Sequence, residues 1–157
     1  MPALNIGDLA TDFALTADNG ESIALKDLRG SQVVLYFYPK DDTSGCTMEA
    51  CGFRDAFASF REAGAVVLGV SSDGQISHRD FSRKFNLPFR LLCDEKGTVQ
   101  RAYGAAWPVL SRVPGLGRLL GPKRHTYVID AAGRIKAIFT IVNVDAHALE
   151  VLEVLKK

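Results

Sequence analysis

The alternation of short, wholly apolar runs with helical segments constrains the fold of this chain most strongly. VVLYFY (residues 33–38) and AVVLGVS (65–71) are rich in β-branched and aromatic residues and lack the polar alternation of a half-exposed strand. Such runs are typical of strands buried on both faces of a sheet. FRLLC (89–93) is a weaker third run, and apolar residues at helical spacing lie between the runs, over 48–60 and 77–86. The pattern therefore predicts a central sheet covered by helices on both faces.

Two hairpins and a final helix complete the expected order of elements. FAL and SIAL flank TADNGE, whose Asn-Gly pair favours a tight turn, and TYVID and IKAIFTIV flank AAGR, with Gly133 at the turn. The last residues, DAHALEVLEVLKK, predict an amphipathic helix. A thioredoxin-like α/β fold, with a central mixed sheet flanked by helices and an N-terminal β-hairpin, fits this order. The pattern alone leaves other doubly wound folds open.

The composition indicates one well-buried core. A chain of 157 residues that is 47% hydrophobic is long enough for one core and too short to need two, so we expect a single domain over residues 1–157. Nineteen Lys and Arg against eighteen Asp and Glu leave a formal charge of +1, which disfavours a nucleic-acid partner. The sequence has no leader pattern at its N-terminus and no apolar run near the roughly 18 residues that span a bilayer. Because three cysteines do not make a secreted disulfide framework, we expect a cytoplasmic protein without membrane contact.

The segment FYPKDDTSGCTMEACGFRD (37–55) places two cysteines at the predicted start of a helix. If that helix begins just after Thr43, Cys46 lies in its first turn, where unpaired amides and the positive end of the helix dipole stabilise a thiolate. Five residues of ideal helix rise about 7.5 Å and turn by about 140°, which puts the Cα atoms of Cys46 and Cys51 about 8.6 Å apart. A disulfide needs a Cα separation of roughly 4.4 to 6.8 Å. A bridge between these cysteines therefore requires at least one helical turn to unwind.

Peroxide reduction is one chemistry that needs a thiolate separated from its partner. The thiolate attacks the O–O bond, becomes a sulfenic acid and condenses with a second thiol. A hydroxyl such as that of Thr43, backbone amides and a cation would stabilise the leaving oxygen. Two other function classes stay open. A thiol–disulfide oxidoreductase would prefer a Cys-x-x-Cys motif, which the sequence lacks, and a non-enzymatic binding or chaperone protein would use the apolar segment 107–120.

YPKDDTSGCTMEACGFRD resembles the active-site segment of the peroxiredoxins. Their pattern of Pro, three residues, Thr or Ser, two residues and Cys is met by Pro39, Thr43 and Cys46. The five-residue offset to Cys51 is similar to the subgroup called peroxiredoxin Q or bacterioferritin comigratory protein, and GVSSDGQISHRDFSRKFNLPFRLLCD and RHTYVID follow in the expected order. The resemblance implies a thioredoxin-like fold and a thiol peroxidase that reduces hydrogen peroxide and organic hydroperoxides.

The resemblance also implies roles for five residues. Cys46 corresponds to the peroxidatic cysteine and Cys51 to the resolving cysteine. Their intramolecular disulfide would be reduced by thioredoxin or glutaredoxin. Pro39 corresponds to the loop proline, Thr43 to the hydroxyl that contacts peroxide, and Arg124 to the active-site arginine. Some subgroup members carry the resolving cysteine in the next helix, around residues 82–85 here, where this sequence has none.

The remaining polar groups are expected to be structural. Glu49, in the first helical turn of the motif, receives only a supporting role. Cys93 is expected to be a small buried thiol at a strand end. Asp41 and Asp42 are expected in a solvated loop ahead of the helix rather than in acid–base work. We expect no cofactor and no metal site, because the three histidines are scattered along the chain: His78, His125 and His147.

Two departures from the subgroup pattern affect the active-site loop and the region before Arg124. Ser44 stands where the subgroup often has proline. The segment from Trp107 to Pro122, within AAWPVLSRVPGLGRLLGPKRH (105–125), differs from the usual glycine- and lysine-rich connection. Its apolar residues predict a loop folded onto the body of the protein. We expect a monomer, with a dimer through residues 107–120 as the alternative.

Overall fold

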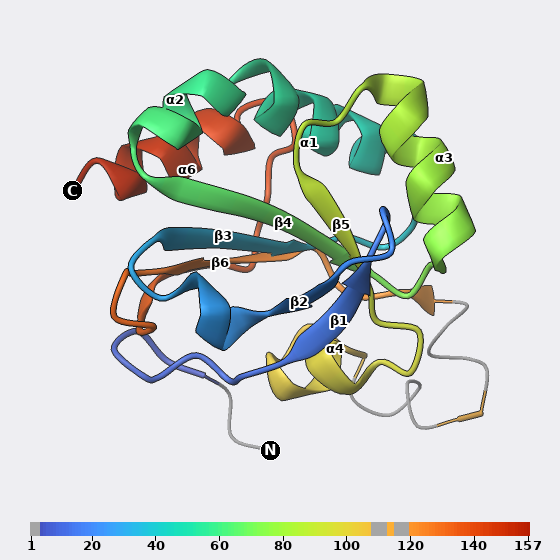
Figure 1. Cartoon of the computed structure of the whole chain (residues 1–157), viewed down its shortest axis with the longest axis horizontal. Helices are drawn as coiled ribbons and strands as arrows, with labels where there is room; N and C mark the ends of the chain where they lie inside the picture. Colours follow the sequence, from blue (N-terminus) through green and yellow to red (C-terminus); the bar gives the residue numbers. More distant parts are fainter. Residues whose placement is uncertain (1–3, 108–112, 115–119) are drawn as a thin grey trace.

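The computed structural model describes residues 4–107, 113–114 and 120–157, which form a seven-stranded mixed sheet (Figure 1). The order across the sheet is β2-β1-β5-β4-β3-β6-β7. The pairs β3–β4 and β4–β5 are parallel, and the other neighbouring pairs are antiparallel. The mixed sheet and the N-terminal hairpin are thereby confirmed. The strands are β1 (Ala14–Ala17), β2 (Ser22–Ala24), β3 (Gln32–Phe37), β4 (Ala65–Ser71), β5 (Arg90–Cys93), β6 (His125–Ile129) and β7 (Ile135–Phe139).

The helices cover both faces of the sheet. In Figure 1, α1, α2, α3 and α6 lie on one side and α4 on the other. The segment expected to be helical over residues 48–60 is two helices, which are separated at Ala56. The helical elements are η1 (Leu25–Leu28, a 3-10 turn), α1 (Ser44–Asp55), α2 (Phe57–Glu62), α3 (Gln75–Phe85), α4 (Thr98–Ala102) and α6 (His147–Leu155). Among the described residues, no helix is long and apolar enough to cross a membrane.

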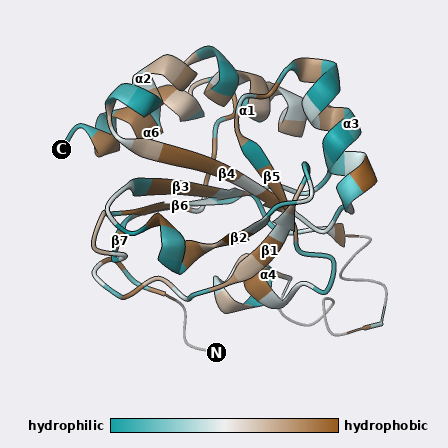
Figure 2. Cartoon of the chain, in the orientation of Figure 1, coloured by the Kyte–Doolittle hydropathy of each residue, from teal (hydrophilic) through white to brown (hydrophobic). Residues whose placement is uncertain are grey.

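The alternation of side chains along β3 explains the two hydrophobic clusters. Val34 and Tyr36 pack into the cluster beneath α1, α2, α3 and α6, whereas Val33, Leu35 and Phe37 pack into the cluster beneath η1 and α4. Successive residues of a strand point to opposite faces, so a wholly apolar strand supplies both clusters. In Figure 2 the strands at the centre are mostly hydrophobic, whereas α3 alternates hydrophilic and hydrophobic residues.

The parallel pairing of β3 with β4 brings two connecting loops to one edge of the sheet. Residues 38–43 link β3 to α1, and residues 72–74 link β4 to α3. The carboxyl ends of parallel strands meet at the same edge, which is where α/β proteins usually place their ligands. This edge carries the cysteine segment.

Candidate active site

The first turn of α1 holds Cys46 beyond the carboxyl end of β3. Thr43 precedes the helix with an extended backbone (φ −93°, ψ 158°), and its carbonyl accepts a bond from the Thr47 amide at 2.8 Å. The predicted start of the helix just after Thr43 is therefore confirmed. Cys46 is buried, with only 1% of its surface exposed. Its sulfur thus shares a water-poor site with the positive end of the helix dipole, which favours a negative charge.

The Thr43 side chain serves the loop rather than the helix. Its hydroxyl donates to the Lys40 carbonyl at 2.9 Å and makes no capping bond to α1. The residue is exposed. Thr43 therefore stands three positions before Cys46 at the surface end of the site, without a hydrogen bond between the two in the part of the chain that the structure describes.

Arg124 joins the cysteine to a buried carboxylate. Its Nη2 donates to Cys46 Sγ at 3.3 Å, and its Nη1 donates to Glu49 Oε1 at 2.7 Å. Burial opposes the charge of Arg124, but Glu49 and Cys46 outweigh it and raise the pKa of the guanidinium. A Cβ at Gly45 would lie 3.2 Å from Nη2, so the absence of a side chain there lets the guanidinium approach the helix. The planar fork of arginine suits this double contact.

Glu49 is the buried partner that the sequence underrated. Burial raises the pKa of its carboxyl to about 7, although Arg124 opposes the shift. Its Oε2 has no hydrogen-bond partner among the described residues and lies 3.9 Å from His147 Nε2. That nitrogen bonds to Thr126 Oγ1 at 2.7 Å. Burial, and then the charge of Arg124, lower the pKa of His147 to about 4, so the imidazole is neutral at pH 7.

Cys51 lies on the same unbroken helix as Cys46. It is half-buried, and Cys46, Cys51 and Cys93 are all free thiols. Because α1 is continuous from Ser44 to Asp55, ideal helix geometry keeps the Cα atoms of Cys46 and Cys51 about 8.6 Å apart. Cys93, expected to be buried, is half-buried at the end of β5. Burial and the charge of Glu95 raise the pKa of its thiol to about 12, which makes it a poor nucleophile.

Phe53 fastens the second half of α1 to the core. Its ring lies 4.7 Å from the ring of Tyr36, 5.5 Å from that of Phe60 and 5.7 Å from that of His147, centroid to centroid. On the same stretch, a Cβ at Gly52 would lie 3.6 Å from the Cβ of Ala148 on α6. Cys46 therefore lies in the first half of α1, and the contacts of Gly52 and Phe53 that pack the helix against the core lie in its second half.

Pro39 and Arg124 line one pocket of about 520 Å³ beside the cysteine segment. Trp107 and Lys123 lie on the same pocket, with Lys123 Nζ 5.3 Å from the centre of the Trp107 ring. Gly121 (φ +68°) passes so close to the Pro39 carbonyl that a Cβ there would collide with it. The segment before β6 therefore braces the proline loop. Most of the apolar segment 107–120, named above as a dimer or partner surface, lies outside the described residues.

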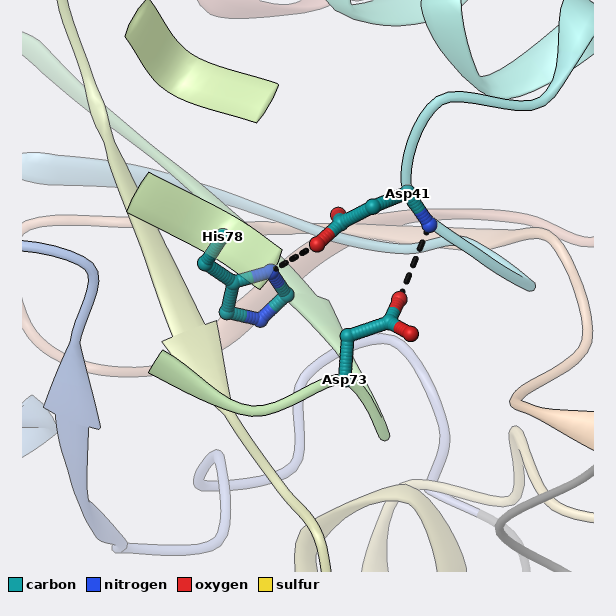
Figure 3. A group of neighbouring side chains, drawn as sticks. All are labelled: Asp41, Asp73 and His78. Carbon is teal, nitrogen blue, oxygen red and sulfur yellow. Dashed lines mark hydrogen bonds and ion pairs between the residues drawn. The ribbon is translucent and has the colours of Figure 1, made fainter. Parts of the chain in front are cut away.

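The prediction that Asp41 is solvated is wrong, whereas Asp42 is exposed as expected. Asp41 is only 7% exposed, and its carboxylate accepts hydrogen bonds from Tyr38, Ser77 and His78, of which Figure 3 shows the bond from His78. Ligand atoms of Asp41, Asp73 and His78 lie within 4.8 Å of one another, but each of these side chains is already held by hydrogen bonds within the protein. Their geometry is that of a hydrogen-bonded network.

The sequence missed the contributions of Asp41, His78 and His147. His78 lies 37 positions after Asp41, and His147 reaches Glu49 from the last helix. Neither pair follows a local period, so no pattern in the chain predicts the contact. The only sequence signal was that the two histidines stand among apolar core positions, as His78 does before Phe81 on α3. His125 stands beside Arg124 at the start of β6, where burial and Lys123 lower the pKa of its imidazole.

Comparison with known proteins gives a family and a consistent set of relatives. Residues 6–138 match the model of the AhpC/TSA family. The peroxiredoxin Bcp of Bacillus subtilis is 43% identical over 154 residues, which cover 98% of this chain and 96% of that protein. The crystal structure of peroxidoxin BcpB from Mycobacterium tuberculosis superposes with a TM-score of 0.87 at 34% identity, covering 98% of this chain and 97% of the other.

A third relative is the bacterioferritin comigratory protein of Xanthomonas campestris, studied for its alkyl peroxide reduction activity. Its structure matches with a TM-score of 0.84 at 32% identity, over 98% of this chain and 96% of that one. These neighbours confirm the thioredoxin-like fold that the element order allowed. With a family match that covers most of the sequence and relatives above 30% identity over nearly its full length, the chain belongs to the AhpC/TSA family and is a thiol-dependent peroxidase of the peroxiredoxin Bcp and Q group.

Proposed function

We propose that Cys46 is the peroxidatic cysteine and Cys51 the resolving cysteine of this peroxidase, with hydrogen peroxide and organic hydroperoxides as substrates. The contact between Arg124 Nη2 and Cys46 Sγ, at 3.3 Å in the first turn of α1, is the observation that carries the proposal. A cation and a helix N-terminus beside one buried sulfur favour its thiolate. The alkyl peroxide reduction reported for the Xanthomonas relative supports the organic substrates.

The first chemical step forms an S–O bond and breaks the peroxide O–O bond. The Cys46 thiolate attacks the terminal oxygen of ROOH, Cys46 becomes a sulfenic acid, and the leaving RO⁻ takes up a proton to give ROH. Arg124 faces the charge that develops on the two oxygens, and the amides of the first turn supply further donors. The Thr43 hydroxyl becomes a further donor when it turns from the Lys40 carbonyl toward the peroxide. Pro39 shapes the wall of the site, and Glu49 orients Arg124.

The second step forms the disulfide. The Cys51 sulfur attacks the Cys46 sulfenic acid, an S–S bond forms and water leaves. The first turns of α1 must unwind for this, because an intact helix holds the two cysteines too far apart. A dithiol protein of the thioredoxin or glutaredoxin type then supplies two electrons and restores both thiols.

We also propose one domain over residues 1–157, a monomeric state and a cytoplasmic location, where thiols are kept reducible.

Peroxide consumption by single-cysteine variants tests the assignment. Cys46→Ser is expected to abolish turnover with thioredoxin or glutaredoxin, and Cys51→Ser to consume one peroxide per chain and stop at a sulfenic acid. Cys93→Ser is the matched control, with turnover unchanged. A mass showing a Cys46–Cys93 bond in the oxidised wild type would move the resolving role to Cys93. Disulfide exchange by Cys46→Ser would favour the oxidoreductase alternative. Peroxide consumption by Cys46→Ser would assign the peroxidatic role to another cysteine.

Hydrogen exchange tests the conformational step. Within residues 43–55, the amides of the first turns of α1 are expected to lose protection when the reduced protein is oxidised by one equivalent of peroxide. Equal protection in the two states would contradict the unwinding of α1. Light scattering at several concentrations decides between the monomer and a dimer through residues 107–120.

A further inference from the structure

Asp41 is the centre of a hydrogen-bonded cluster that ties the active-site loop to two other parts of the chain, and Figure 3 shows its contacts with His78 and Asp73. Its Oδ1 accepts from the Tyr38 hydroxyl at 2.5 Å, and its Oδ2 accepts from Ser77 Oγ at 2.8 Å and from His78 Nδ1 at 2.7 Å. Its backbone amide donates to Asp73 Oδ2 at 2.8 Å. We call these five residues the loop anchor. Tyr38 follows β3, Asp73 follows β4, and Ser77 and His78 lie on α3, so the anchor joins three elements.

The hydrogen-bond partners of His78 make it a cation. Its Nε2 lies 2.9 Å from the Leu92 carbonyl oxygen, which can only accept. Its Nδ1 faces the Asp41 carboxylate, which also accepts. Both nitrogens therefore carry a proton, and His78 and Asp41 form an ion pair that is 0% and 4% exposed at its side chains. Burial alone would lower the pKa of His78, but the hydrogen bond and charge of Asp41, helped by Asp73, raise it.

Among the described residues, the loop between β3 and α1 is also restrained by the Thr43 hydroxyl, which donates to the Lys40 carbonyl, and by Gly121, which packs against the Pro39 carbonyl. Asp42 has a left-handed backbone (φ 57°), which non-glycine residues rarely adopt. The helix that follows has no side-chain cap. The exposed pair between Lys84 and Asp42, at 2.9 Å, is of the kind that contributes little in water. Because Tyr38, Asp41 and His78 are buried and bonded to one another, the loop anchor restrains this loop from within the protein.

We propose that His78 is a positioning residue for peroxide reduction, which fixes the loop of residues 39–43 through Asp41 so that Thr43 and the first turn of α1 keep their places around Cys46. This inference rests on the proposed role of Cys46. It extends to the disulfide step, because Asp41 lies in the loop just before Ser44, the first residue of α1. Residues 39–42 then stay fixed while the first turns unwind, and they give the helix a defined starting point when it re-forms after reduction.

The rate of Cys46 oxidation in a single turnover without reductant tests the proposal. The variant His78→Gln removes the charge, and the matched control Lys84→Gln removes the exposed pair to the same loop from the same helix. We expect His78→Gln to lower the second-order rate constant with hydrogen peroxide by about 10- to 100-fold, the cost of a misplaced reacting group. Lys84→Gln is expected to stay within about 3-fold of wild type, the range of an exposed pair. Equal rates for the two variants would overturn the proposal.

The pH dependence separates positioning from a general loss of stability. Among the residues that the structure describes, the charged and titratable groups that face His78 are Asp41, Asp73 and Tyr38. Because the ion pair exists only while His78 is protonated, the ratio of wild-type to His78→Gln rates is expected to fall as pH rises through the pKa of His78, which lies above 6.5. A ratio that does not change with pH would contradict the ion pair. Should His78→Gln fail to fold, Ser77→Ala removes one bond to Asp41 and is expected to slow oxidation about 2- to 5-fold; a wild-type rate for it would count against the anchor.

Exchange of the Asp41 amide tests the link to unwinding. In oxidised wild-type protein this amide is expected to remain protected while amides 47–51 exchange, and in His78→Gln it is expected to exchange faster in both redox states. Unchanged Asp41 protection in His78→Gln would overturn the inference. Oxidation of Cys46→Ser by peroxide at the wild-type rate would instead overturn the proposed function, so the two failures are distinguishable.

Discussion

Arg124 holds Glu49 at 2.7 Å with one guanidinium nitrogen and reaches the Cys46 sulfur at 3.3 Å with the other. The same side chain therefore neutralises a buried carboxylate and faces the reacting atom. Neither contact can be removed without disturbing the other, and this coupling makes distinct predictions for stability and for rate.

Replacing Arg124 by Gln is expected to cost about 10²- to 10³-fold in the rate of Cys46 oxidation, the usual effect of removing a donor to a developing oxyanion. It is also expected to destabilise the protein, because Glu49 is left buried without its counter-charge. The double variant Arg124→Gln/Glu49→Gln should regain stability in urea unfolding but not the rate. Recovery of both together would show that Arg124 acts only through folding. Arg124→Lys is expected to remain slow, since a lysine cannot make both contacts in one geometry.

Glu49 is expected to make stability fall with rising pH. Its pKa is about 7 in the folded protein against 4.5 ordinarily, so the folded state binds more protons between these values. Below pH 4.5 the carboxyl is protonated in both the folded and the unfolded state, so its burial costs no charge. Above pH 7 it is ionised in both states, and burying the carboxylate lowers the unfolding free energy by about 3 kcal/mol. Relative to wild type, Glu49→Gln should therefore gain up to about 3 kcal/mol of unfolding free energy between pH 4.5 and 8. Urea unfolding gives the unfolding free energy of each protein at each pH. A difference between the two proteins that stays constant across this pH range would contradict the buried carboxylate.

His147 is expected to act in the opposite direction. Its folded-state pKa is about 4 against 6.5 ordinarily, so the unfolded chain binds the extra proton and stability is lost as pH falls from 6.5 to 4. Between pH 4.5 and 6.5 this loss offsets the gain from Glu49, and wild-type stability should be nearly flat. In His147→Gln the gain from Glu49 remains alone, and stability should rise on acidification. Thermal unfolding across this range is the measurement, and a flat profile in the variant would disprove the compensation.

Gly121→Ala is expected to damage the active site through Pro39. Gly64→Ala is the matched control, because both glycines have positive φ (+68° and +72°) but a Cβ at Gly64 would meet no atom of the described residues within 4 Å. The control should lose only about 1 to 2 kcal/mol of unfolding free energy, because alanine disfavours a left-handed backbone, and it should keep full activity. Gly121→Ala must also move the Pro39 carbonyl, so both stability and the rate of peroxide reduction should fall further. Equal activities would mean that the segment before β6 does not brace the proline loop.

The sequence predicted the parts of the fold that local pattern controls. The wholly apolar run of β3 predicted burial on both faces because each successive side chain enters a different cluster. Thr43 and the apolar period after it predicted where α1 begins. The break at Ala56 was not predicted, because the apolar period continues through it into α2.

The polar core could not be predicted in the same way. Asp41 has the sequence context of a loop and is buried only because α3 brings Ser77 and His78 to it. Glu49 lies next to exposed Met48 on α1, and its partner Arg124 is 75 positions away. Such contacts depend on how the strands are ordered in the sheet, which one sequence does not encode in any short window. The resemblance to a family supplied Arg124, whereas the residues alone favoured a solvated charge.

The anchoring of Phe53 in the core limits the disulfide step to the turns before it. Since Tyr36, Phe60 and His147 hold that ring, oxidation should convert only the start of α1 from a closed surface into an extended strand of accessible backbone. A reductant that binds the extended form would lose its docking site as soon as it has delivered its electrons. Reduction itself would then release the reductant, and reduced enzyme would not compete with oxidised enzyme for it.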